Sequence, residues 1–551
     1  MALRNRSSRL LFALALMSLP ICAQELPDVG NPLSEMHPQY EIEVVRPMDW
    51  TKGVADIDFL PDGKMVVGVY TPAKNFGEVP PASDIYVFEN VIGNSDRTRI
   101  IAKKIGSGFV DALGVTTVGN RIFITDRTRV TELVGDHNGL TLDAAKILWT
   151  GFTVGASFNM WSHGGIHKNG SIYVGLGLNW PEEAPIGDDR DMLWKVDIAT
   201  GKAEAQCGGL RSPSGLTLGP EGEIFAAENQ GGWKPADQLI QLNPNRFYGF
   251  RKTPPGKFDN LPVTKPAVWL PHGEVSRSPC GPAYIQNAAF GGPYKGHMIM
   301  GDIHYGGIQR IYLEKVAGRY QGAVFRFMGG LESASMSLKF GPDGNLYMAG
   351  LGGPHTDWRW KDKMYGLQRI KRKANPPPVF EMLAIRNTGN SAFEVEFTDE
   401  LSDAALSAAN WQVKSWTYKP TQDYYGPKLD VKTHVVTKIT IESSRKRAVL
   451  EFSGIDTNRV YAFKPNFKSA SGLSLWTKEG WYTLNAFGPG TDAPVATSNQ
   501  SQLLPPKIWG NPLRANKIEL QKVGDKHLWL SPTGRKLKHN AFGQTTLFNQ
   551  P

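Results

Sequence analysis

The clearest candidate for chemistry is a histidine set among glycines. His163 lies in the segment Met160-Trp161-Ser162-His163-Gly164-Gly165-Ile166, directly before an apolar stretch that predicts a strand. A neutral imidazole accepts a proton near neutral pH, and neighbouring glycines let a substrate approach closely. His163 is therefore a candidate general base. A single loop histidine is more often structural than catalytic, so this role depends on its surroundings.

A second candidate group follows an arginine. Arg211 precedes the predicted strand Pro213-Ser214-Gly215-Leu216-Thr217-Leu218, and a glycine turn leads to another strand and the polar loop Glu228-Asn229-Gln230-Gly231-Gly232. Backbone carbonyls in such a loop could hold a hard cation such as Ca²⁺. The alternative is a glycine-rich connection between structural units, which is the commoner use of such a loop.

Two further polar segments, Pro271-His272-Gly273-Glu274 and Asp302-Ile303-His304-Tyr305, also stand beside glycines. Together with His163 and Arg211, they would suit an enzyme without a cofactor. Such a site could abstract a proton next to a carboxylate and eliminate a glycosidic bond. Structural loop histidines are the simpler interpretation.

The elements that must position these residues form a repeat. Between residues 50 and 373 the chain repeats an apolar strand, a glycine turn and a second apolar strand at intervals of about 50 residues. Asp-Gly and Asn-Gly pairs suit hairpin turns that need positive φ. Five copies are clear, and Ala289–Met300 is a weaker sixth. The clear copies are Ile57–Val67, Val115–Ile124, Ile166–Val174, Leu216–Phe225 and Leu338–Met348.

Six copies predict an all-β fold with a six-bladed β-propeller over residues 24–373. A Pro-rich linker would follow at 374–378, and then a small β-sandwich at 379–490. Residues 491–551 form a basic C-terminal extension. The sandwich aromatics could present a sugar-stacking face, or they could simply pack inside the sandwich. They are Trp411, Trp416, Tyr418, Tyr424 and Tyr425.

The first residues have the pattern of a signal peptide. Basic residues precede an apolar run over Leu10–Leu19, and Ala23 offers a small residue for cleavage. We therefore expect residues 1–23 to be removed and the protein to be periplasmic or secreted. Lipidation at Cys22 is a weaker alternative because the bulky Ile21 precedes it. No later run is long and apolar enough for a membrane span.

Export bears on the two cysteines that remain, Cys207 and Cys280. An oxidising compartment permits a disulfide between them, and two inert thiols are an equally acceptable reading. Neither cysteine belongs to a CxxC or CxxCH motif, which excludes a c-type haem site.

The net charge of +9 is concentrated at the two ends of the chain. The leader holds Arg4, Arg6 and Arg9, and residues 503–551 carry eight Lys or Arg against two acidic residues. The remainder is near neutral, so no nucleic-acid surface is expected. The basic tail could contact an acidic glycan or the cell envelope, or stay solvated.

The motifs, taken together, resemble those of the soluble quinoprotein glucose/sorbosone dehydrogenases. In order along the chain they are His163-Gly164-Gly165, Gly209-Leu210-Arg211-Ser212-Pro213-Ser214-Gly215-Leu216 and Glu228-Asn229-Gln230-Gly231-Gly232. Later matching segments are Gly301-Asp302, Gln309–Lys315 and Gly341–Gly344. The resemblance covers roughly residues 50–373 and implies a six-bladed propeller.

The resemblance also implies roles. His163 would take the proton of a sugar hydroxyl while hydride moves to pyrroloquinoline quinone (PQQ). Arg211 would stabilise the negative charge that develops on the quinone. The carbonyls of Gly231 and Gly232, with Gln230 beside them, would hold Ca²⁺ against the quinone oxygens.

This sequence departs from the family pattern at three points. The family carries an Arg-x-Arg pair in its last blade, where this chain has Ala334-Ser335-Met336-Ser337-Leu338. Ser162 replaces an acidic residue, and Gly232 replaces a proline. A tricarboxylate cofactor would lose strong bidentate pairs without the two arginines. Lys339, Arg277 or Arg310 would have to replace them, or the quinone is absent.

Three functions therefore stay open. The first is a PQQ- and Ca²⁺-dependent dehydrogenase that oxidises a sugar or polyol and passes electrons to a separate acceptor, since this chain has no haem motif. The second is a cofactor-free carbohydrate-active propeller such as a polysaccharide lyase. The third is a glycan-binding protein. The presence of both His163 and Arg211 favours an enzyme.

Overall fold

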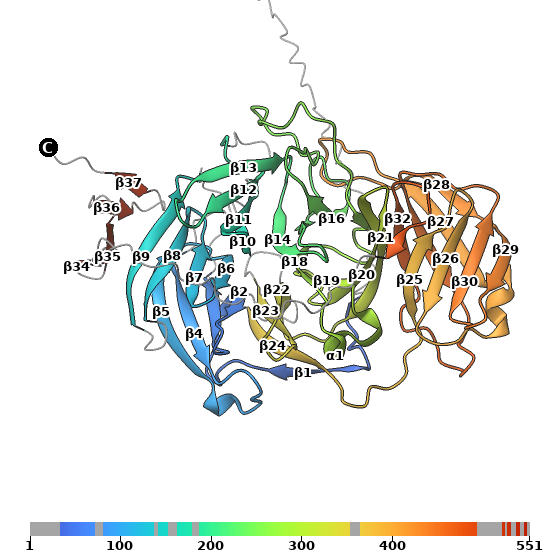
Figure 1. Ribbon diagram of the computed structural model, residues 1–551, viewed down its shortest axis with the longest axis horizontal. Coiled ribbons are helices and arrows are strands. Elements are labelled where there is room, and N and C mark those ends of the chain that lie inside the picture. The colour runs from blue at the N-terminus through green and yellow to red at the C-terminus, as the bar shows by residue number, and fades with distance from the viewer. Residues whose placement is uncertain are drawn as a thin grey trace, which may run out of the picture.

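The computed structural model describes residues 33–71, 81–136, 141–152, 162–178, 187–352 and 364–492, together with four short strands between residues 521 and 547. Six blades of four antiparallel strands each surround a central axis; five are separate sheets, and the fifth blade continues into the β-sandwich at the side of this ring (Figure 1). This arrangement confirms the predicted all-β fold of a six-bladed propeller followed by a sandwich.

Each blade begins at the axis and runs outward. The first blade consists of β2 (Gly53–Phe59), β3 (Met65–Tyr70), β4 (Ser83–Glu89) and β5 (Ile101–Phe109). The second consists of β6 (Gly114–Val118), β7 (Arg121–Thr125), β8 (Arg129–Asp136) and β9 (Thr141–Thr150). The third consists of β10 (Ser162–Lys168), β11 (Ser171–Leu176), β12 (Met192–Asp197) and β13 (Ala203–Gly208).

The next three blades follow the same plan. The fourth blade consists of β14 (Pro213–Leu218), β15 (Ile224–Glu228), β16 (Asp237–Leu242) and β17 (Val268–Leu270). The fifth consists of β18 (Pro279–Tyr284), β19 (Met298–Asp302), β20 (Ile308–Val316) and β21 (Arg319–Met328). The sixth consists of β22 (Ala334–Phe340), β23 (Leu346–Leu351), β24 (Tyr365–Arg372) and β1 (Tyr40–Val44).

The turns predicted from glycine pairs have the expected backbone. Gly63, Gly119, Gly170, Gly222 and Gly344 all adopt positive φ between the first and second strands of their blades. Only glycine takes this conformation without steric cost, so these residues fix the hairpins and their register. The second strands β3, β15, β19 and β23 are buried along their whole length because neighbouring blades cover both faces.

The ring closes through the first strands of the six blades. β2, β6, β10, β14, β18 and β22 contact one another in succession, and β22 returns to β2. Close approach depends on glycine at several points. A Cβ on Gly215 would lie 2.8 Å from the amide nitrogen of Gly281, and a Cβ on Gly281 would lie 2.6 Å from the Cα of Ser337.

The first strands also share an irregularity. Five of the six pairings between first and second strands shift register at the same level, at Ala55, Gly164, Ser214-Gly215, Gly281-Pro282 and Met336. β-Bulges of this kind turn a backbone locally and are common beside functional sites. Here they bring the bulged residues to the central channel.

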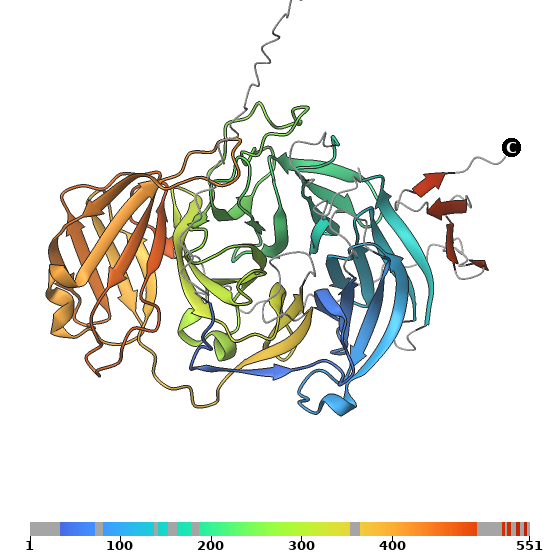
Figure 2. The same ribbon diagram turned by 180° about the vertical axis from the view of Figure 1, so that it is seen from behind.

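The sixth blade takes its outermost strand from the other end of the propeller sequence. β1 pairs antiparallel with β24, Tyr40 facing Arg372 and Val44 facing Gln368. Both views show β1 beside β24 at the edge of the ring (Figures 1 and 2). The first and last propeller strands are thereby joined, which leaves the sixth blade with four strands like the others.

The sandwich shares a sheet with the propeller. β21 of the fifth blade pairs with β32 (Gly480–Leu484), and the sheet continues through β31 (Arg459–Pro465), β27 (Trp411–Thr417) and β28 (Leu429–His434). Thr491–Asp492 (β33) pairs with β20. The second sandwich sheet has the order β25 (Met382–Asn387), β26 (Ala392–Phe397), β30 (Arg447–Phe452) and β29 (Val436–Ile441).

The hydrophobic cores show the same continuity. One core joins Tyr312 and Phe325 of the fifth blade to Phe393, Phe463 and other sandwich residues. Another joins blades four and five to Trp416 and Trp481. Because the burial of apolar surface is the main stabilising term in folding, the propeller and sandwich are expected to unfold together.

One predicted repeat was wrong. The weak copy at Ala289–Met300 is not a pair of strands, because Ala288–Gly291 is a short helix (α1) capped by the Asn287 side chain, and Gly292–Tyr294 is a 3₁₀ turn. The strand that pairs with β19 is β18, which lies earlier in the sequence. Strong burial of Phe290 explains the apolar pattern that suggested a strand.

The remaining elements are small. Short 3₁₀ turns lie at Arg97–Arg99, Asp403–Leu406 and Ala408–Asn410. In the C-terminal extension, β34 (Gln521–Val523), β35 (Lys526–Leu530), β36 (Lys536–His539) and β37 (Thr545–Leu547) pair in sequence order. The signal-peptide prediction for residues 1–23 lies outside the described residues. Within the described ranges, no helix has the length and hydropathy of a membrane span.

Candidate functional site

The face of the propeller where the six first strands begin is called the mouth here. Antiparallel pairing brings several loops to it. Arg211 and Ser212 precede β14, and the loop Glu228–Lys234 follows β15, whose last residue Glu228 pairs with Pro213 at the start of β14. The loop Pro271–Ser278 leads into β18, and Asp302–Tyr305 follows β19. These segments collect most of the residues that the sequence singled out.

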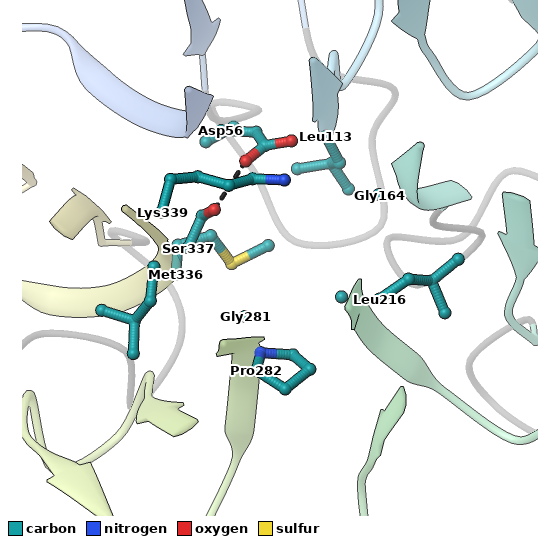
Figure 3. A pocket seen from close by; sticks show the side chains of 12 residues that line it. Asp56, Leu113, Gly164, Leu216, Gly281, Pro282, Met336, Ser337 and Lys339 are labelled. Carbon is teal, nitrogen blue, oxygen red and sulfur yellow. Dashed lines mark hydrogen bonds between the residues drawn. The ribbon is translucent and has the colours of Figure 1, made fainter. Parts of the chain in front are cut away.

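Beneath the mouth runs a narrow channel lined by all six blades (Figure 3). The channel has room for roughly one water molecule. It is too narrow for a ligand of sugar or quinone size. The lining residues include Ala55, Leu113, Gly164, Leu216, Gly281 and Met336.

Lys339 is engaged within this channel. Figure 3 shows its side chain beside Asp56, which accepts a hydrogen bond of 2.6 Å from the Ser337 hydroxyl and one of 2.8 Å from the Val115 amide. Burial raises the pKa of Asp56, and Lys339 partly offsets that effect. Burial alone would lower the pKa of Lys339, but Asp56 and Asp58 raise it overall. The negative charges of Asp56 and Asp58 therefore stabilise the protonated form of Lys339.

Lys339 also stands at the wrong end of its strand for the predicted cofactor contact. It is the last residue but one of β22, whereas the mouth lies at the first residue, Ala334. Arg211 stands just before the first residue of β14. The structure thus does not bring Lys339 together with Arg211.

Arg211 lies buried at the mouth, with 6% of its surface exposed. Its guanidinium rests on Gly231, where a Cβ would come within 1.8 Å of Nε. The ring of Tyr424 lies on it, 5.2 Å from the guanidinium carbon. Glycine at position 231 is therefore required for this placement. The structure brings Arg211 and the 230–232 loop together, and their role as a functional site stays a prediction.

Beneath Arg211, Glu228 anchors the backbone. Its Oε1 accepts hydrogen bonds from the amides of Arg211 (2.6 Å) and Ser212 (3.1 Å). The Lys234 ammonium lies 3.8 Å from the same oxygen, with 1% of its side chain exposed. Burial raises the pKa of Glu228 and lowers that of Lys234, and the attraction between the two groups partly offsets both shifts.

Gln230 is held through a different carboxylate. Its amide donates to Asp237 Oδ1 at 3.0 Å, and Asp237 Oδ2 lies 2.9 Å from His272 Nδ1. Asp237 is fully buried. A carboxylate that binds one imidazole nitrogen orients the ring, as in catalytic Asp–His pairs. The His272 ring stacks on Tyr425 at a centroid distance of 5.8 Å and an interplanar angle of 18°.

A loop of the sandwich, Tyr418–Lys428, completes this part of the mouth. The Trp233 amide donates to Thr421 O at 2.6 Å, the Tyr425 amide to Gly231 O at 3.2 Å and the Gly426 amide to Pro235 O at 2.9 Å. Lys428 pairs with Glu274 of the mouth. Trp233 adopts φ of +64°, a strained conformation for a bulky residue that these contacts maintain.

The structure places the backbone of His163 at the mouth. It is the second residue of β10 and faces Gly175 at a bulge. Its side chain lies outside the described residues, so its role stays a prediction. Gly164 and Gly165 beside it pack against the first strands of the adjacent blades, which gives these two glycines a structural function.

The predicted calcium donors do not fit a metal ion. The carbonyl oxygen of Gly231 already accepts the amides of Lys234 (3.0 Å) and Tyr425 (3.2 Å). Gly232 forms a β-bridge with Tyr424. Two buried cations, Arg211 and Lys234, stand where the ion would need anionic ligands. Within the described ranges, no group of three or more His, Cys, Asp or Glu side chains is arranged to hold a metal.

PQQ carries carboxylates, and the positively charged residues of the mouth suit these anions better than they suit a metal ion. Arg277 lies on the mouth loop before β18, and its amide donates to Asp302 at 2.9 Å. Arg310 does not reach this face, because it is buried and donates to Leu383 O (2.8 Å) and Met382 O (2.7 Å) at the start of the sandwich. The start of β22 carries only Ala334, serines and Met336. Of the arginines considered, Arg211 and Arg277 are the two that lie in mouth segments, and a cofactor-binding role for them stays a prediction.

The two cysteines and the sandwich aromatics have separate places. Cys207 and Cys280 are both free and buried, and burial raises the pKa of each thiol. Trp411 and Trp416 belong to hydrophobic cores, which confirms ordinary packing for them. Tyr424 is 41% exposed and Tyr425 covers His272, so both belong to the mouth.

A scan of protein-family models gives no match, and neither does a search of curated proteins. The search of solved structures finds similar chains at low sequence identity. A putative glucose dehydrogenase from Thermus thermophilus is 17% identical, with a TM-score of 0.44, over 60% of this chain and 99% of that one.

Two further solved structures show similarity of the same extent. The PQQ domain of pyranose dehydrogenase from Coprinopsis cinerea is 12% identical, with a TM-score of 0.44, over 61% of this chain and 96% of its own. The PQQ-bound aldose sugar dehydrogenase from Streptomyces coelicolor is 16% identical, with a TM-score of 0.40, over 61% of this chain and 100% of that one.

Two residues of the mouth, Lys234 and Asp237, were not singled out in the sequence. Tyr424 was named only as a possible sugar-stacking aromatic of the sandwich, and not as a partner of Arg211. Lys234 and Asp237 lie within ten residues of the Glu228–Gly232 motif. Charged residues so close to a glycine-rich loop were a signal that could have been used.

Proposed function

We propose that this protein is a carbohydrate-active oxidoreductase that oxidises a hydroxyl of a sugar or polyol at the propeller mouth. The observation that carries the proposal is the Arg211 guanidinium, held between Gly231 and Tyr424 and almost fully buried. A fixed positive charge in a site of low dielectric stabilises negative charge strongly, and it needs no reorganisation during the reaction.

PQQ is the proposed cofactor. When bound, it would supply a quinone that accepts the hydride released from the sugar carbon. Arg211 and Arg277 would pair with its negatively charged groups, as guanidinium groups do with carboxylates. His163, at the start of β10, is the proposed base that removes the proton from the sugar hydroxyl. Gln230 is the proposed neighbour of the cofactor.

The remaining partners follow from this chemistry. Reduced cofactor must pass its electrons to a separate acceptor. We also propose that residues 1–23 direct export and that the protein acts in the periplasm or outside the cell. Carbohydrate in that compartment would be the substrate.

A second candidate is a carbohydrate-active enzyme without a cofactor, or a glycan-binding protein. The hydrogen-bonded Asp237–His272 pair favours the enzyme, because a buried carboxylate that orients an imidazole is suited to proton abstraction. The start of β22, which lacks the family's arginine pair, also favours a function without the quinone.

Turnover of reconstituted protein separates these functions. The full chain would be incubated with PQQ and assayed against a panel of aldoses and polyols with a dye acceptor. We expect reduction of the dye that requires PQQ and is lost in His163→Gln and Arg211→Ala. Arg319→Ala is the matched control, since Arg319 is exposed at the start of β21 and pairs with Val316, at the end of the fifth blade opposite the mouth. No dye reduction, with cleavage of a polysaccharide instead, would favour the second candidate.

A further inference from the structure

The loop that follows β15 contains an ammonium group in an unusual position. The family resemblance predicted that carbonyls of this loop bind a metal ion. The structure instead turns the loop around Lys234, whose backbone exchanges two hydrogen bonds with Gly231, at 2.9 and 3.0 Å. The loop is therefore closed on itself before any ligand binds.

The Lys234 side chain ties the loop to two other segments. Its ammonium donates to the carbonyl of Tyr248 and lies 3.8 Å from Glu228 Oε1. Glu228 in turn holds the amides of Arg211 and Ser212. A buried carboxylate needs a counter-charge, and Lys234 provides it.

We propose that the Lys234 ammonium takes the place of a metal ion in this loop, so that the mouth holds its anionic ligand without calcium. The inference rests on the proposed function insofar as that ligand is PQQ. Lys234 acts as a positioning residue. It neutralises the Glu228 carboxylate, and Glu228 fixes the backbone of Arg211. Arg211 then faces the ligand.

Electrostatic repulsion explains why a calcium ion and the Lys234 ammonium would not occupy the loop together. A divalent ion beside Lys234 and Arg211 would meet two like charges with little water to screen them. The carbonyl of Gly231 is occupied by amide donors. Two buried oxygens, Glu228 Oε2 and Asn229 Oδ1, lack hydrogen-bond partners among the described residues. The Lys234 ammonium, 3.8 Å from the other oxygen of Glu228, supplies the positive charge beside them.

Calcium binding is the direct test. Ca²⁺ would be titrated calorimetrically into the full chain, and thermal unfolding would be recorded with Ca²⁺ and with excess EDTA. We expect no saturable binding and the same unfolding temperature in both solutions, because a ligand of the native state would raise it. If Ca²⁺ binds and Glu228→Gln abolishes the binding, the proposal is overturned.

Replacing the ammonium gives a second test. Lys234→Met should leave Glu228 uncompensated and create a response to Ca²⁺, seen as a rise in unfolding temperature that the wild type lacks. Lys252→Met is the matched control, because Lys252 is equally buried and bonds Gly187 O (2.9 Å), Arg190 O (3.1 Å) and Asp191 (3.0 Å), a carboxylate other than Glu228. An equal response in both variants would overturn the specific role of Lys234.

Binding of PQQ in the presence of EDTA separates the two proposals. Binding that needs added Ca²⁺ and is lost in Glu228→Gln would overturn this inference while the proposed function survived. No binding in any solution would overturn the proposed function, and the Ca²⁺ titrations would still decide the question of the loop.

Discussion

The guanidinium of Arg211, in the fourth blade, lies 5.2 Å from the ring centroid of Tyr424, in the sandwich. The two residues are far apart in the sequence and are brought together because the Tyr418–Lys428 loop bonds to the backbone of Gly231–Pro235. The sandwich is therefore part of the mouth as well as a neighbour of the fifth blade. The mouth cannot be reproduced by the propeller alone.

Tyr424→Ala tests this contact. Removing the ring exposes Arg211 to water and loosens it, so we expect a loss of stability of about 0.5–1 kcal/mol and weaker binding of PQQ. Tyr424→Phe keeps the ring and should behave like the wild type. Urea unfolding and calorimetry measure the two effects. Identical behaviour of the alanine and phenylalanine variants would show that the ring does not support Arg211.

Gly281→Ala tests ring closure. A Cβ at Gly281 would lie 2.6 Å from Ser337 Cα, and φ is +51°. We expect overpacking to cost about 1–3 kcal/mol beyond the backbone strain of about 1–2 kcal/mol. Gly119→Ala is the control, with φ of +58° and no atom within 4 Å. It should show the backbone strain alone. Equal losses in urea unfolding would mean that the blades do not need this close approach.

Glu314→Gln tests a buried carboxyl between the propeller and the sandwich. Burial raises the pKa of Glu314 from 4.5 to about 7, although Tyr482, Asn387 and Gln321 donate to it. Between these values the unfolded chain ionises while the folded protein keeps its proton. Stability should therefore fall as pH rises from about 4.5 to about 7, by about 3 kcal/mol from this residue.

The variant provides the comparison for this pH effect. Glu314→Gln cannot ionise, so the difference in unfolding free energy between variant and wild type should grow in its favour over that range. Urea unfolding at several pH values measures it. A difference that stays constant with pH would show that Glu314 titrates normally in the folded protein.

Local patterns in the sequence predicted most of the fold. Glycine turns with alternating apolar strands gave five of the six hairpins in their observed places, because a hairpin depends on neighbours in the chain. The pairing of β1 with β24 and of β21 with β32 could not be seen in this way. Edge strands such as Tyr40–Val44 pair with segments hundreds of residues distant, and their sequences do not specify the partner.

The same limit applies to the candidate site. Arg211 and the Glu228–Gly232 loop were correctly placed together, because β14 and β15 form one hairpin. The partners of Gly231 were missed, because Tyr425 comes from the sandwich and Lys234 turns back within the loop. Lys339 was expected at the mouth from its residue type, but its position in β22 sets it beside Asp56.

The measurement that tests the central claim most directly is a calorimetric titration of PQQ into the full chain and into Arg211→Ala, with Arg319→Ala as control. We predict saturable binding by the wild type and the control. Loss of charge-assisted hydrogen bonds of about 1.5–3 kcal/mol should weaken binding by Arg211→Ala roughly tenfold or more. No binding by folded wild-type protein, or equal affinity in Arg211→Ala, would contradict the assignment of Arg211 as the centre of a quinone site.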